Sequence, residues 1–101
     1  MAKLNLTKLT CVRKQDVTGV DEAEIWLDGH LRWNNTMKKN QSRDLSLHQE
    51  FGDSIVVELK ERNPNSSKSL GMRTIEAHNP GSSPIDFKTS GADYECFFNV
   101  T

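Results

Sequence analysis

The sequence predicts an all-β protein: a single antiparallel β-sandwich of about eight strands that spans residues 1–101. Three observations predict this fold class. Apolar and polar residues alternate with a period of two along most segments, as in strands that have one buried face. Segments rich in Gly, Pro, Asn and Ser interrupt this alternation at intervals of about 8–12 residues. No long window shows a helical apolar stripe with start and stop signals.

The first predicted strand changes phase part-way along. Leu4 and Leu6 occupy even positions, whereas the next apolar residues, Leu9 and Cys11, occupy odd positions. A β-bulge near Thr7 would bring both pairs to the same face, because a bulge inserts one extra residue into a strand.

The next two strands form a hairpin in "LDGHLRW", which is the clearest local signal in the chain. Ala23, Ile25 and Leu27 alternate with polar or amphipathic neighbours before the turn. Asp28 and Gly29 are residue types that tolerate the positive φ angles of a type I′ turn. We therefore expect a two-residue hairpin turn at this dipeptide.

The remaining strands follow from the same patterns. Leu45 and Leu47 alternate with polar residues, and so do Tyr94, Cys96 and Phe98 near the C-terminus. Residues 54–61, "SIVVELKE", are β-branched and nearly continuous, which is typical of a central strand. The segments "NPNSSKSLG" and "HNPGSSP" are predicted loops.

Composition narrows the possible functions. The chain has 13 basic and 14 acidic residues and a net charge of −1, so it lacks the basic excess of nucleic-acid-binding proteins. No segment reaches the ~20 apolar residues of a transmembrane helix. The start at Met1 has no apolar signal region, which indicates a cytoplasmic protein if Met1 is native. Five glycosylation acceptor patterns would instead suit a secreted chain whose signal was removed.

The two cysteines, Cys11 and Cys96, are too few for a disulfide framework or a four-ligand zinc site. Both fall in apolar strand patterns. We therefore expect buried thiols, with a bridge between the first and last strands as the alternative.

The segment "QDVTGVDEAEIW" raises the question of a cation site. Asp16 and Asp21 are expected on the loop between the first two strands, with Gly19 allowing the backbone to turn between them. Calcium binds six to eight oxygens, mostly from carboxylates and carbonyls that converge from loops. The alternative is a solvated loop without a metal.

This acidic stretch resembles the first calcium loop of C-two domains, the calcium- and lipid-binding β-sandwiches of synaptotagmins and protein kinase C. "VVELKERNPNSSKSLGMRTI" is similar to the third loop of that family, with Leu70 and Gly71 matching its closing pair. The resemblance covers roughly residues 9–75. It implies a C-two-like sandwich and calcium ligands at Asp16, Asp21, Glu61 and Asn63.

The departures from the family pattern predict weak calcium binding or none. Two aspartates of the third-loop motif fall on Glu61 and Asn63, and a later one falls on Lys68. Lys60 and Arg62 would also bring positive charge to the same loop, and calcium affinity falls with the ligand charge count. The expected cofactor is therefore none, or weakly bound calcium.

Four residues are candidates for contact with a partner. Lys38, Lys39 and Arg43 form the one basic cluster and could face anionic lipid headgroups. Trp26 shares a strand face with Glu24, opposite Ile25. It is an interface anchor if that face is open and a core residue if it is covered.

The sequence thus predicts a non-catalytic binding module, C-two-like with weakened or lost calcium dependence, whose loops contact a membrane surface or a protein. The histidines show no metal-binding spacing and the serines form no nucleophile elbow, so we do not expect an enzyme. The alternative is a secreted structural or carbohydrate-related accessory domain.

Overall fold

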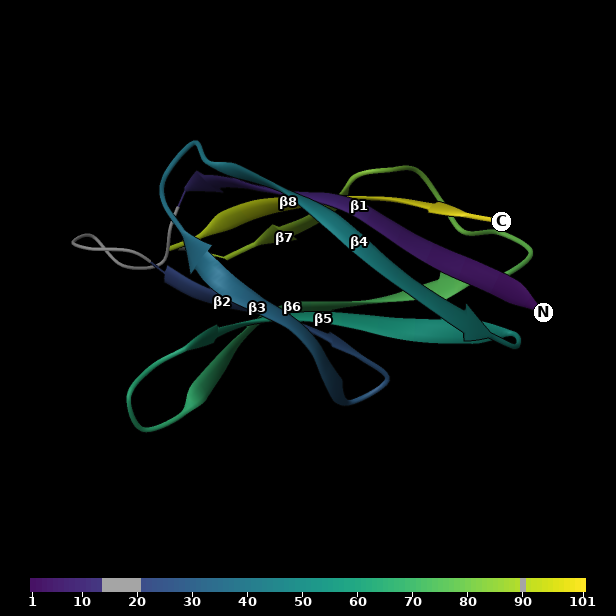
Figure 1. Ribbon diagram of the computed structural model, residues 1–101, viewed down its shortest axis with the longest axis horizontal. Coiled ribbons are helices and arrows are strands. Elements are labelled where there is room, and N and C mark those ends of the chain that lie inside the picture. The colour runs from purple at the N-terminus through teal and green to yellow at the C-terminus, as the bar shows by residue number, and fades with distance from the viewer. Residues whose placement is uncertain (14–20, 90) are drawn as a thin grey trace.

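The computed structural model describes residues 1–13, 21–89 and 91–101. These residues form eight strands and no helix (Figure 1). The strands are β1 (Ala2–Arg13), β2 (Asp21–Leu27), β3 (His30–Met37), β4 (Ser42–Phe51), β5 (Ser54–Arg62), β6 (Ser67–Glu76), β7 (Ile85–Lys88) and β8 (Asp93–Val100).

The strands form two four-stranded antiparallel sheets packed as a sandwich, which confirms the predicted fold class. Sheet A has the order β4-β1-β8-β7, and sheet B has the order β3-β2-β5-β6. Figure 1 shows the β3–β4 turn and the β5–β6 connection at one end of the sandwich, with both termini at the other. Backbone hydrogen bonds between Lys3 and Thr101, 2.9 Å each, tie the termini together.

The core lies between the sheets and includes inward-facing residues that the alternation predicted, such as Ile25, Tyr94 and Cys96. Strand β5 shows the pattern clearly, because Ile55, Val57 and Leu59 are buried while the residues between them are only partly covered. Strand β8 behaves in the same way, with Tyr94 fully buried. Alternating burial of this kind fixes the register, because a shift of one residue would turn the apolar face to water.

Three local predictions are confirmed. The ladders of β1 with both β4 and β8 shift register between Leu6 and Lys8, where the bulge was expected. Asp28 and Gly29 have φ angles of 49° and 80° and join β2 to β3. The carboxylate of Asp28 also accepts a hydrogen bond from the Val56 amide at 2.8 Å, which fixes the turn to β5. Strand β5 is central in its sheet, as its sequence predicted.

The cysteine prediction also agrees with the structure. Cys11 and Cys96 lie on the adjacent strands β1 and β8, and both are buried thiols rather than halves of a disulfide. Burial raises the pKa of Cys96 to about 12. Because the thiolate is the reactive form, this residue is an inert part of the core at neutral pH.

The placement of Asp21 on a loop was wrong. Asp21 is the first residue of β2 and is fully buried. Its carboxylate accepts a hydrogen bond from the Tyr94 hydroxyl at 2.5 Å, and this bond links sheet B to sheet A. Burial, reinforced by this hydrogen bond, raises the pKa of Tyr94, so the hydroxyl remains protonated and can donate.

Candidate functional site

The outer face of sheet B carries the most organised group of polar side chains in the described part of the chain. It is formed by the residues of β2 and β5 that alternate with the core positions. Glu24 pairs with Lys60, and Trp26 pairs with Glu58, in the β2–β5 ladder. Residues on this face point away from the sandwich core, so solvent would normally cover them.

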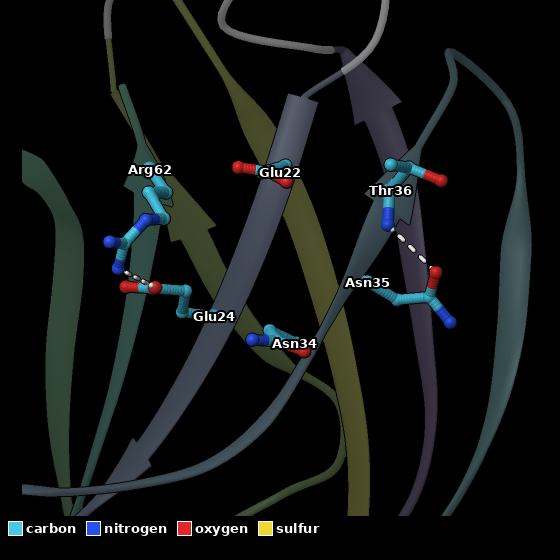
Figure 2. Close-up of a pocket in the computed structure, with 6 residues that line it drawn as sticks. All are labelled: Glu22, Glu24, Asn34, Asn35, Thr36 and Arg62. Atoms are coloured by element: carbon cyan, nitrogen blue, oxygen red, sulfur yellow. Dashed lines mark hydrogen bonds and ion pairs between the residues drawn. The ribbon is translucent and has the colours of Figure 1, made fainter. Parts of the chain in front are cut away.

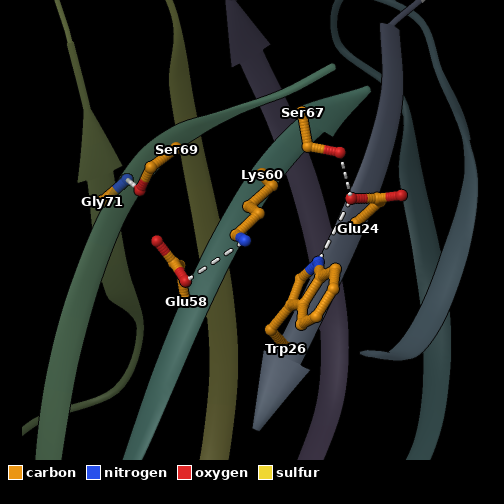
Figure 3. Close-up of polar contacts among 7 residues, drawn as sticks. All are labelled: Glu24, Trp26, Glu58, Lys60, Ser67, Ser69 and Gly71. Carbon is orange, nitrogen blue, oxygen red and sulfur yellow. Dashed lines mark hydrogen bonds and ion pairs between the residues drawn. The ribbon is translucent and has the colours of Figure 1, made fainter. Parts of the chain in front are cut away.

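Glu24 is the unusual member of this face, because it is fully buried although it points away from the core. One carboxylate oxygen accepts hydrogen bonds from Trp26 Nε1 at 3.1 Å and from Ser67 Oγ at 3.0 Å (Figure 3). The other oxygen accepts from Arg62 Nη1 at 3.3 Å. Three neighbouring side chains, from strands β2, β5 and β6, therefore cover one carboxylate.

Glu24 stays ionised in this setting. Burial alone raises the pKa of the Glu24 carboxyl, but hydrogen bonds from Trp26, Ser67 and Arg62 and the charge of Arg62 outweigh burial. The net result is a pKa below the ordinary value of a glutamate. The carboxylate can therefore hold its donors in place at neutral pH.

Trp26 is held on its other side by Lys60. The Lys60 ammonium lies 4.1 Å from the centre of the Trp26 ring, a cation–π geometry. The same ammonium lies 3.8 Å from a carboxylate oxygen of Glu58 (Figure 3). The indole is thus positioned by Glu24 at its N–H and by Lys60 at its face, and it is half-buried rather than part of the core.

A pocket of about 260 Å³ adjoins the Glu24–Arg62 pair (Figure 2). Its lining residues come from β2, β3 and β5 and all have polar side chains: Glu22, Glu24, Asn34, Asn35, Thr36 and Arg62. Arg62 reaches Glu24 with one nitrogen while 59% of its side chain remains exposed. The pocket therefore presents a fixed guanidinium beside carboxylate, amide and hydroxyl groups.

Two exposed apolar side chains extend the same face on either side of Trp26. Leu31 on β3 pairs with Trp26, and Met72 on β6 pairs with Glu58. Leu31 is 42% exposed and Met72 is 63% exposed. Aromatic residues, methionine and arginine are enriched in protein interaction surfaces.

The predicted calcium residues are only partly brought together. Glu61 is buried on β5, next to Ala23 in the β2–β5 ladder, so it lies near Asp21 at the same end of sheet B. With its amide nitrogen turned toward Glu61, Asn63 donates to the two carboxylate oxygens at 2.9 and 3.2 Å. Asp16 lies outside the described residues. Residues 1–13, 21–89 and 91–101 contain no group of three or more metal-ligating side chains.

The placement of Lys60 and Arg62 on a loop was wrong, because both lie on strand β5. Strand alternation places both residues on the outer face of sheet B, whereas Glu61 between them points inward. Their charges are directed at Trp26, Glu58 and Glu24. Adjacent residues in a strand point to opposite faces of the sheet, so their side chains are not neighbours in space.

The basic cluster is split by the turn that joins β3 to β4. Arg43 is engaged with Thr36, donating from Nε to its backbone oxygen at 2.7 Å and from Nη2 to its hydroxyl at 3.3 Å. Lys38 and Lys39 are exposed in the turn, where Asn40 takes a φ of 65°. Backbone hydrogen bonds to Cys11 hold the turn against β1.

Comparison with protein-family models and with curated proteins finds no match for this chain. Within the described residues, no helix has the length and apolar character needed to cross a membrane.

Proposed function

We propose that this chain is a non-catalytic binding module, similar to a C-two domain with weakened or lost calcium dependence. In this proposal the contact surface is the outer face of sheet B, centred on Trp26 and Arg62. The main support for this proposal is the fully buried Glu24. An ion pair with one largely exposed partner contributes little net stability, so we infer that the value of this pair lies in holding Trp26 and Arg62 in fixed positions. Preorganised side chains of these two types are frequent hot spots in binding interfaces.

The hydrogen bonds of the predicted calcium ligands support weak or absent calcium dependence. Asp21 accepts from Tyr94 and Glu61 accepts from Asn63, so a calcium ion would have to displace these donors. Calcium also needs six to eight oxygen ligands at about 2.3–2.6 Å. The outer face of sheet B contains neither residue and would remain formed without a metal.

The charges on this face favour a partner of mixed polarity over an anionic bilayer. Glu22, Glu24 and Glu58 offset Lys60 and Arg62, so this surface has no basic excess. The exposed Lys38 and Lys39 would add only about 1 kcal/mol each toward anionic lipids. The balance of charges among these residues supports binding to a protein surface rather than to a membrane.

Binding of the labelled chain to cells of the source organism tests this function. We expect saturable binding that EDTA leaves unchanged and that Trp26→Ala or Arg62→Ala reduces at least tenfold. Lys8→Ala is the matched control, because Lys8 makes a similar cation–π contact with Phe97, 4.5 Å from the ring centre, in the other sheet. Loss of binding in EDTA, or an equal loss in the control, would contradict the proposal. So would a requirement for anionic vesicles.

A further inference from the structure

The polar pocket on the outer face of sheet B differs from the rest of that face. All six lining residues have polar side chains, while Trp26, Leu31 and Met72 lie outside it. A volume of about 260 Å³ lies just below the usual range of small-molecule pockets, about 300–1,000 Å³. The pocket is therefore of a size for one small ring or functional group.

Several groups around the pocket retain unused hydrogen-bonding capacity. The amide of Asn34 and the carboxylate of Glu22 are exposed, and neither makes a side-chain hydrogen bond to the described residues. Among the residues that the structure describes, Arg62 donates only from Nη1, which leaves its other N–H groups available. An amide donates and accepts, a carboxylate accepts and a guanidinium donates. A ligand that satisfies all three must both donate and accept at closely spaced positions.

The charges exclude an anionic ligand. Glu22 and Glu24 bring two negative charges to the pocket and Arg62 brings one positive charge, so an anion would meet net repulsion. An apolar ligand is also disfavoured, because it would leave these polar groups without partners.

A cationic ligand is disfavoured for a different reason. Both oxygens of Glu24 are already engaged by donors, and the guanidinium of Arg62, which lines the pocket, would repel a cation. Glu22 alone would remain to pair with a cation. An exposed pair of this kind contributes only about 0–1 kcal/mol.

From this chemistry we propose that the pocket binds a neutral sugar ring, such as an exposed residue of a glycan. Each hydroxyl of a sugar both donates and accepts, which matches the mixed set of Asn34, Glu22 and Arg62. Adjacent hydroxyls can engage the two arms of one amide or guanidinium. Glu24 acts as a positioning residue that holds Arg62 in the pocket lining, and Trp26 lies outside the pocket with its indole N–H bonded to Glu24. The inference rests on the proposed function, since it names the chemical class of partner for the same face.

Titrations followed by amide NMR test the sugar proposal directly. The neutral probes are methyl β-D-galactopyranoside, methyl α-D-glucopyranoside and methyl α-D-mannopyranoside. The charged controls are N-acetylneuraminic acid and methylammonium, and a glycan array extends the set of neutral sugars. We expect at least one neutral sugar or array glycan to shift the signals of Glu24, Asn34 and Arg62 while the charged probes do not. Asn34→Ala should weaken binding at least tenfold, and Lys8→Ala should leave it unchanged.

Other outcomes would overturn the proposal. Shifts produced by methylammonium or N-acetylneuraminic acid, but by no neutral sugar, would assign the pocket to an ion. The absence of shifts across the sugar set and the array would show that it binds no sugar. The cell-binding test separates that failure from failure of the proposed function. If Trp26→Ala and Arg62→Ala still abolish cell binding, the face is a contact surface for a protein.

Discussion

Arg62 and Glu24 form an unequal ion pair across the outer face of sheet B. Their closest atoms, Nη1 and Oε2, are 3.3 Å apart, yet 59% of the arginine side chain is exposed and the glutamate is fully covered. The arginine can return to water if its partner is lost. The carboxylate cannot, because Trp26 and Ser67 also enclose it. This asymmetry predicts different costs for removing the two partners.

Glu24→Gln should lower the free energy of unfolding by about 1–3 kcal/mol, the range for leaving a buried hydrogen-bonding group unsatisfied. The new amide nitrogen must face a donor, either Arg62 or the pair Trp26 and Ser67. Arg62→Ala should cost less than about 1 kcal/mol, because an exposed ion pair is screened by solvent. Urea denaturation of both variants shows which substitution lowers the free energy of unfolding more. A larger loss for Arg62→Ala would contradict this description of the network.

The stability contributed by Glu24 should depend on pH. Its pKa in the folded protein lies below the ordinary value of 4.5. A lowered pKa gives stability that is complete above the unfolded-state pKa and is lost as pH falls through the folded-state pKa. The difference in unfolding free energy between the parent and Glu24→Gln should therefore be constant above about pH 5 and shrink below about pH 4.5. Urea denaturation of both proteins from neutral to acidic pH measures this difference. A difference that grows on acidification would contradict a lowered pKa of Glu24.

The fold could be predicted from sequence because its main signals are local. Alternation identified the strands, the phase change between Leu6 and Leu9 identified the bulge, and Asp28-Gly29 identified the turn. Each of these patterns reports on residues a few positions apart. Asp21 was misplaced because an acidic residue beside a glycine suggests a loop, whereas its hydrogen bond to Tyr94 joins residues 73 positions apart.

The site could not be predicted from the sequence, because it also depends on contacts between residues far apart in the chain. Trp26 was identified as a contact candidate, and Glu24 was noted only as sharing its face. Arg62 and Ser67 reach Glu24 through the pairing of β2, β5 and β6, which no local pattern specifies. The useful sequence signal was a glutamate and a tryptophan at outward positions of one strand. The residues that bond to Glu24 from other strands, Arg62 and Ser67, can be identified only when the pairing register of the strands is known.

Gly29→Val should destabilise the protein by about 1–3 kcal/mol through backbone strain. Gly29 has a φ of 80°, and a β-carbon there would meet nothing within 4 Å, so the cost comes from the backbone rather than a clash. Gly52→Val is the matched control, because Gly52 also has open space around it and no positive φ. Thermal unfolding compares the two. Equal melting temperatures for both variants would be inconsistent with a strained hairpin turn.

Calcium at one millimolar should stabilise the chain by no more than about 1.4 kcal/mol, which corresponds to a dissociation constant of about 10⁻⁴ M or weaker. The reason is that Asp21 and Glu61 already accept hydrogen bonds from Tyr94 and Asn63. Asp21→Asn should itself cost about 1 kcal/mol without calcium, because the link between the sheets is weakened. Calorimetry with calcium and with EDTA measures both effects. A large calcium-induced rise in melting temperature would show a working metal site.

The outer face of sheet B is the contact surface that we propose. Photo-crosslinking tests it most directly, with a benzophenone amino acid placed at residue 72 or residue 86 in cells of the source organism. Met72 is exposed beside Glu58 on sheet B, and Asp86 is exposed on β7 of sheet A. We predict a discrete adduct from residue 72 that Glu24→Gln and Trp26→Ala abolish, and none from residue 86. Adducts from residue 86 alone, or adducts from residue 72 that persist in both variants, would contradict the claim.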